Sequence, residues 1–133
     1  MRLLHSSRTI LAINGIVLIF MGLSFFFFAE HITIKMFPNI QSNPAALEIA
    51  VILRYLMGAG SLATGIILYL ARISVRSGAQ RVLMGSGIGF IIIFLTSLYI
   101  FIKFKADIPY FGLILYPALG LVSLYVSSRK FQE

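Results

Sequence analysis

The chain has 133 residues, of which 59% are hydrophobic and 11% are charged, and its mean hydropathy is +0.98. These values exclude an ordinary soluble globular domain, in which about half of the residues are apolar and about a quarter are charged. The absence of cysteine excludes disulfides, thiolate metal sites and thiol nucleophiles.

The first predicted span covers residues 9–29, an uncharged apolar stretch long enough to cross about 30 Å of hydrocarbon as a helix. Arg2 and Arg8 precede it, as basic residues precede the core of a signal peptide. The apolar run is longer than a typical signal-peptide core, and "FFFFAEH" lacks the small residue expected three positions before a cleavage site. We therefore expect a retained membrane span.

The segment that follows, "EHITIKMFPNIQSNPAAL", mixes polar and apolar residues, and we expect it to lie on the membrane surface. Asn43 followed by Pro44 is typical of a helix start, because asparagine caps the first turn and proline suits the first helical position. The second span is predicted over residues 49–71, so its helix begins before the hydrocarbon does.

The third span is predicted over residues 82–102. The connection before it, "RISVRSGAQR", is short and basic, and Ser77 and Gly78 predict a turn within it. Short connections force neighbouring helices to be antiparallel.

The fourth span is predicted over residues 108–128, with Pro109 near its start. Pro117 should kink this helix, because proline has no N–H and its ring clashes with the carbonyl one turn earlier.

Membrane spans of this kind must be helical, because lipid offers no hydrogen-bonding partner to backbone N–H and C=O groups. Residues 1–133 are thus predicted to form a single all-α domain, an integral membrane four-helix bundle with antiparallel, up-down spans.

Basic residues gather on one side of these spans, and the positive-inside rule then places both termini in the cytoplasm. Anionic lipid headgroups account for the net charge of +7 without a nucleic-acid partner. The basic residues predicted inside are Arg2, Arg8, Arg72, Arg76, Arg81, Arg129 and Lys130, and those predicted outside are Lys35, Lys103 and Lys105.

Small residues in the second and third spans predict close helix packing, within the bundle or against a partner, with a pore lining as the alternative. Gly85 and Gly89 have the G-x-x-x-G spacing, and Ser61 and Gly65 have the related small-x-x-x-small spacing. We expect packing roles for Gly58, Gly60, Ser61, Gly65, Gly85 and Gly89. A faint internal similarity also matches Gly15 and Gly22 of the first span with Gly58 and Gly65.

Arg54 is the single charged residue in the apolar run "ILRYLMGAGSLATG". If Arg72 marks the inner edge of the hydrocarbon, Arg54 lies only a few ångströms inside the outer edge at about 1.5 Å per residue. It is then either an anchor whose guanidinium reaches the headgroups or a site that holds an anion or an acidic side chain. The residues proposed to contact a ligand or partner are Arg54, Glu30, Asp107 and Tyr110, with Glu48 as a further acid on that side.

We expect no enzymatic activity, because the chain shows no catalytic or metal-binding constellation. His5 and His31 lie at opposite ends of the first span and cannot share a metal. The acids at Glu30, Glu48, Asp107 and Glu133 are scattered and form no carboxylate pair. No catalytic residue, metal or cofactor is therefore predicted.

The layout resembles a known group of proteins. A first span ending in "FFFFAEHITIKMF", a proline-containing loop, "NPAALEIAVILRYLMGAGSLATGIILYLAR" and two further spans resemble small four-helix bacterial membrane proteins of unknown function, broadly DoxX-like. The most specific part is Arg54 followed by Gly58, Gly60 and Gly65. The third span departs from this pattern, since "FLTSLYIFIK" stands where that group often has an arginine. The resemblance implies the fold and a multi-pass place in the bacterial cytoplasmic membrane, and no activity.

Three functions remain open. The first is an accessory or structural subunit that packs into a larger membrane complex, favoured by minimal loops and glycine-rich faces. The second is a small homo-oligomeric carrier or binder of a hydrophobic ligand such as a lipid or quinone, since the span centres are too apolar for a polar pore. The third, a cofactor-binding membrane redox component, would use His31 as a ligand. The partners expected are lipids and other transmembrane subunits or further copies of the chain.

Overall fold

The computed structural model describes residues 6–104 and 108–129, with only the backbone of Arg76 and Phe104. Four helices in this part are long and apolar enough to cross a membrane. This confirms the predicted all-α class, and each predicted span corresponds to one of these four helices. The elements are α1 (Ser7–Phe27), α2 (Ala29–Met36), the 3-10 helix η2 (Pro38–Ser42), α3 (Pro44–Ala71), α4 (Arg76–Phe104) and α5 (Tyr110–Ser128).

Helix α3 begins where the sequence predicts. The side chain of Asn43 caps it by accepting a hydrogen bond from the Ala46 N–H at 3.2 Å, and Pro44 occupies the first helical position. With 28 residues the helix is about 42 Å long, which exceeds the roughly 30 Å of a hydrocarbon core. Its first turns therefore extend beyond the span predicted over residues 49–71.

The turn predicted at Ser77 and Gly78 is wrong, because both residues lie in the first turns of α4. The chain turns earlier, over residues 72–75. Because α4 begins at Arg76, Ala79 lies in its first turn and is fully buried in the core. That burial outweighs the weak local preference of serine and glycine for a turn.

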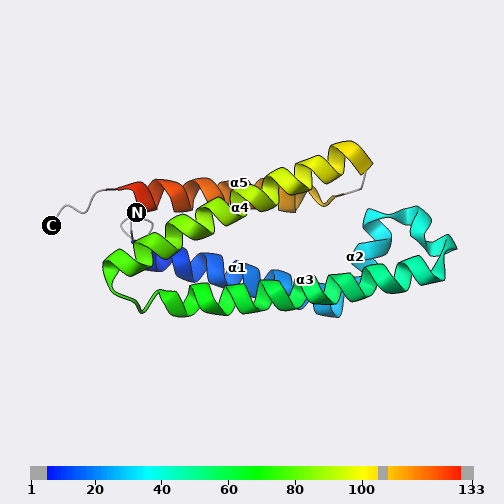
Figure 1. Ribbon diagram of the computed structural model, residues 1–133, viewed down its shortest axis with the longest axis horizontal. Coiled ribbons are helices and arrows are strands. Elements are labelled where there is room, and N and C mark those ends of the chain that lie inside the picture. Colours follow the sequence, from blue (N-terminus) through cyan, green and yellow to red (C-terminus); the bar gives the residue numbers. More distant parts are fainter. Residues whose placement is uncertain (1–5, 105–107, 130–133) are drawn as a thin grey trace.

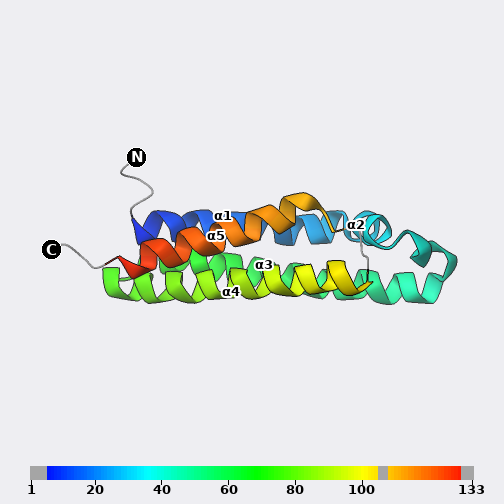
Figure 2. The same ribbon diagram turned by 90° about the horizontal axis from the view of Figure 1, so that it is seen from above.

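The long helices lie side by side as two pairs, α1 with α3 and α4 with α5 (Figure 1). The two pairs meet mainly through α1 and α4. The start of α1, the end of α5 and the turn between α3 and α4 lie at one end of the molecule in both views (Figure 1, Figure 2). We call this the basic end, because Arg8, Arg72 and Arg129 lie there.

The core occupies the half of the molecule next to the basic end. Among the described side chains, Phe90 is the last buried one in α4, and α5 buries none before Gly120. The two pairs are thus packed together near the basic end, whereas the other ends of α4 and α5 are largely uncovered. The apolar core consists of Ile10, Leu11, Leu18, Leu68, Ala79, Leu83, Phe90 and Val126.

A short helix, α2, occupies much of the segment between the first two spans, which the sequence predicts to lie on the membrane surface. The backbone leaves the helical region at Phe28, with φ of −122° and ψ of 24°, and a new helix starts at the next residue. Ala29 and Thr33 are buried, and α2 packs beside the first half of α3 (Figure 1). The position of this segment on the membrane surface stays a prediction.

Candidate functional site

Arg54 is buried where α1, α2 and α3 meet, with only 8% of its surface exposed. Its Nη2 donates a hydrogen bond to the Sδ of Met36, the last residue of α2, at 3.2 Å. Its Cζ lies 5.3 Å from the centre of the Phe25 ring in α1, a cation–π distance. Gly58, one turn further along α3, makes room for Phe25, because a Cβ there would lie 3.1 Å from the Phe25 Cβ.

The structure does not gather the predicted contact residues around Arg54. No carboxylate within residues 6–104 or 108–129 lies at ion-pair distance from its guanidinium, and Glu30 and Glu48 are both exposed. Tyr110 is 75% exposed at the start of α5. Asp107 lies outside the described residues. Sequence reasoning missed Met36 and Phe25, because nothing local in those stretches marks a contact with α3.

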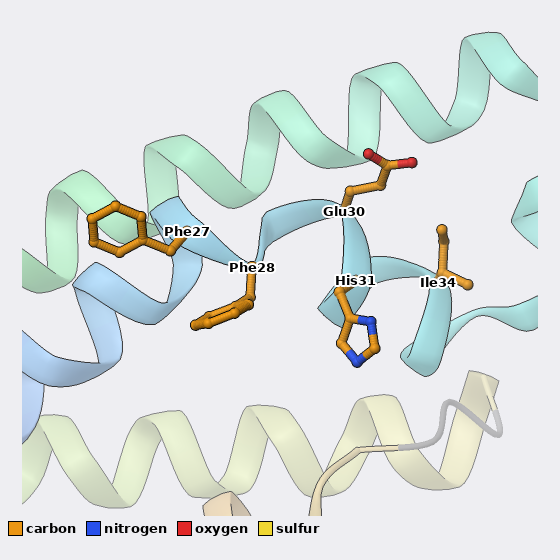
Figure 3. A pocket seen from close by; sticks show the side chains of 5 residues that line it. All are labelled: Phe27, Phe28, Glu30, His31 and Ile34. Carbon is orange, nitrogen blue, oxygen red and sulfur yellow. The ribbon is translucent and has the colours of Figure 1, made fainter.

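A second feature is an open pocket of about 360 Å³ at the junction of α1 and α2, lined by Phe27, Phe28, Glu30, His31 and Ile34. Figure 3 shows Phe28 and His31 projecting to one side of this junction and Glu30 projecting to the opposite side, toward α3. The two polar side chains therefore do not form a carboxylate–imidazole pair. The pocket is lined by two phenylalanines, an isoleucine, a carboxylate and an imidazole, and its volume is within the range of small-ligand sites.

Glycines form the contact between α1 and α3. A Cβ added to Gly15 would lie 2.7 Å from the Gly65 carbonyl oxygen, and one added to Gly22 would lie 2.8 Å from the Gly58 carbonyl oxygen. The Ser61 Oγ adds a hydrogen bond of 2.8 Å to the Leu18 carbonyl. The glycines that the sequence matches between the first two spans thus form the contact between two antiparallel helix faces. Their equal spacing was the signal in the sequence that could have revealed the pairing of α1 with α3.

Gly60, Gly85 and Gly89 lie elsewhere. A Cβ added to any of them would meet no other atom within 4 Å, apart from its own helical neighbours. These three glycines therefore make no close contact with another helix in the described part of the chain, so packing within the bundle is not their role. Their packing against a partner stays a prediction.

The glycines that join α4 to α5 were missed. A Cβ on Gly87 would lie 3.1 Å from the Gly120 carbonyl oxygen, and one on Gly120 would lie 2.9 Å from the Ile91 Cδ1. Gly87 lies between Gly85 and Gly89 in sequence but faces the opposite way. The G-x-x-x-G spacing predicts close packing in general and does not determine which face of a helix does it.

Pro117 lies inside α5, which continues to Ser128. The neighbouring Tyr116 stacks on Phe90 of α4, with ring centres 6.1 Å apart. The kink expected at Pro117 stays a prediction.

A buried polar contact joins α1, α4 and α5 and was also missed. The Nδ2 of Asn14 donates to the Oγ of Ser123 at 2.8 Å and to the Oγ of Ser86 at 3.3 Å. Asn14 and Ser123 are fully buried, and the Asn14 Oδ1 has no hydrogen-bond partner. Interhelical hydrogen bonds of this kind connect membrane helices, so the cluster holds the two helix pairs in register.

Within the described part of the chain, no three histidine, aspartate or glutamate side chains cluster as a metal site would need. Comparisons with protein-family models, with curated proteins and with solved structures find no match to this chain. The resemblance to DoxX-like proteins therefore stays a prediction from the sequence.

Proposed function

We propose that this chain is a non-enzymatic integral membrane protein that serves as an accessory subunit of a larger membrane complex. The observation that carries the proposal is the outward face of α4, which consists of Gly85, Gly89, Ile92 and Thr96. These residues follow one another at spacings of four and three, so they form a continuous stripe along one side of the helix. Ile92 is 57% exposed, and a Cβ added to either glycine would meet no atom of another helix within 4 Å in the described part of the chain.

The outward face of α4 has no neighbouring helix of the described chain against its glycines, whereas the glycine-containing faces inside the two helix pairs do. Gly15, Gly22 and Gly87 each lie where a neighbouring helix backbone comes within about 3 Å of the position of a Cβ. In lipid, exposed glycines favour close contact with another helix, because van der Waals packing between backbones drives association there. A transmembrane helix of a partner subunit is the occupant that suits this face.

The proposal also includes the membrane in which the protein lies and the orientation of its helices. We propose a multi-pass protein of the bacterial cytoplasmic membrane, an antiparallel up-down bundle with both termini in the cytoplasm. Support comes from the basic end, where Arg72 lies over the Tyr69 ring at 4.0 Å and Arg129 over the Tyr125 ring at 4.4 Å. Paired basic and aromatic side chains are typical of an interface, and an excess of basic residues is typical of its cytoplasmic side.

The experiment compares two positions on one helix. Leucines at both Gly85 and Gly89 should release the chain from its complex on native gels in mild detergent. The expected loss is about 1–3 kcal/mol of association free energy, because the added side chains hold the partner helix away. The bundle itself should keep its melting temperature. Gly87→Leu is the matched control and should instead lower the melting temperature, because its side chain would collide with α5.

Two results would reject the accessory role. One is a wild-type chain that purifies from its native membrane without any other transmembrane protein. The other is a Gly85→Leu, Gly89→Leu variant that retains the wild-type complex.

A second candidate function is a small homo-oligomeric binder or carrier of a hydrophobic ligand. The pocket beside Phe27, Phe28 and Ile34 favours it, because three of its five lining residues are apolar and it lies near the end of a membrane span. Mass spectrometry of lipids and quinones that co-purify with the chain tests it. Phe28→Ala should then reduce the recovery of that ligand, and unchanged recovery would remove the pocket from consideration.

A further inference from the structure

The Arg54 side chain is mostly buried, and within residues 6–104 and 108–129 its guanidinium has no oxygen acceptor. It carries five N–H donors and a permanent positive charge. The acceptors present are the Met36 thioether, a weak acceptor at 3.2 Å, and the face of the Phe25 ring. A charged group at membrane depth is normally paired with an anion or a carbonyl. No carboxylate in residues 6–104 or 108–129 forms an ion pair with it.

The depth of Arg54 indicates where an anion would come from. Along α3, Arg54 lies about 27 Å from Arg72, at about 1.5 Å per residue. Arg72 marks the interface at the basic end, since it lies over Tyr69. With a hydrocarbon core of about 30 Å, Arg54 lies within a few ångströms of the opposite interface. Lipid phosphates lie just beyond this boundary, within the reach of an arginine side chain.

Neighbouring residues fit the same interface. Tyr55, next to Arg54, stacks on Phe26 with ring centres 5.8 Å apart, as aromatic side chains do at headgroup level. Lys35, next to Met36 at the end of α2, is exposed and adds a second positive charge to this region. A planar guanidinium can grip two oxygens of a phosphate at once, which a lysine cannot.

We infer that Arg54 binds a phosphate group, that of a phospholipid in the leaflet opposite the basic end, beside Phe25 and Met36. The lipid supplies the oxyanion that residues 6–104 and 108–129 do not supply. This site is separate from the outward face of α4, so it does not depend on the accessory function proposed above.

The test uses the full chain in dodecyl maltoside, with native mass spectrometry to count the lipid retained. Dioctanoyl phosphatidylglycerol should be retained, whereas dioctanoylglycerol, which lacks the phosphate, should not. Arg54→Leu should raise the apparent Kd for the phospholipid by at least about tenfold, because charge-assisted hydrogen bonds are lost. Arg54→Lys should give an intermediate loss, because it keeps the charge and lacks the planar fork.

Two control variants distinguish lipid binding at Arg54 from the general effects of losing a charge or of altering α2. Arg81→Leu removes an exposed charge at the basic end and should retain lipid as the wild type does. Met36→Leu removes the sulfur acceptor and leaves the guanidinium in place, so lipid retention should persist.

Four outcomes would overturn the inference. In the first, Arg54→Lys matches the wild type, which would make Arg54 a simple interfacial anchor. In the second, Met36→Leu loses as much lipid as Arg54→Leu, so that displacement of α2 explains the loss. In the third, Arg81→Leu has the effect of Arg54→Leu, which indicates a non-specific charge effect. In the fourth, inorganic phosphate binds in an Arg54-dependent manner while phosphatidylglycerol is not retained, so that a free anion is the ligand.

Discussion

Replacing Gly65 by alanine tests the α1–α3 contact where the two backbones come close together. A Cβ at this position would lie 2.8 Å from the Gly15 carbonyl oxygen and 2.8 Å from the Ile19 nitrogen. Both neighbours are backbone atoms, so no side-chain rotation can relieve the clash. The two helices must move apart locally by roughly 0.6 Å to restore ordinary contact distances of about 3.4 Å or more.

The loss of unfolding free energy follows from this movement of α1 away from α3. Overpacking a close contact costs about 1–3 kcal/mol, and here the loss of dispersion contacts along the seam adds to the strain. Gly60→Ala is the matched control in the same helix, because a Cβ there meets nothing within 4 Å. The two variants make the same chemical change, so their helix propensities change alike. The difference between their unfolding free energies should therefore be about 1–3 kcal/mol, with Gly65→Ala the less stable.

Reversible unfolding in mixed micelles with increasing dodecyl sulfate measures this difference, and circular dichroism checks that both variants stay helical. Gly65→Ala should unfold at a lower mole fraction of dodecyl sulfate than Gly60→Ala. If the two unfold together, α1 and α3 do not meet at the Gly15–Gly65 contact, and the reasoning is refuted.

Two further predictions concern the core and the topology. Ser123→Ala should destabilise the chain by about 0.6–1.7 kcal/mol in the same unfolding assay, because Asn14 loses its 2.8 Å bond. Ser86→Ala should cost less, since that bond is 3.3 Å long, and an equal or larger cost would contradict the geometry. A reporter active only outside the cytoplasm should work when inserted in the segment from Glu30 to Asn43 and fail when fused after residue 133. The reverse pattern would overturn the proposed orientation.

Some features were predictable because they depend on a continuous stretch of chain. The length and apolarity of each span predict a helix wherever it lies, since lipid leaves the backbone no other way to satisfy its hydrogen bonds. Likewise, the cap at Asn43 involves residues three apart. The helix α2 was not predictable in this way, because its eight residues show no long apolar run. It lies beside α3, and Ala29 and Thr33 are buried in the folded chain.

Of the candidate site, the sequence indicated Arg54 but not the residues that contact it. Arg54 stands out as a charge within an apolar run, and its depth follows from helical rise alone. Its surroundings do not, because Phe25 and Met36 reach it from α1 and α2 only once those helices are placed. The acids predicted as partners by depth, Glu30 and Glu48, are exposed and form no ion pair with it.

The sequence by itself determined that this is an all-helical chain with four apolar helices, because hydropathy and capping are local properties. Only the tertiary structure decided which side of each helix meets a neighbour. Gly85, Gly87 and Gly89 are chemically identical and nearly adjacent, yet Gly87 packs on Gly120 and the other two are uncovered. The rotation of a helix about its own axis depends on all of its neighbours at once, and no single segment encodes it.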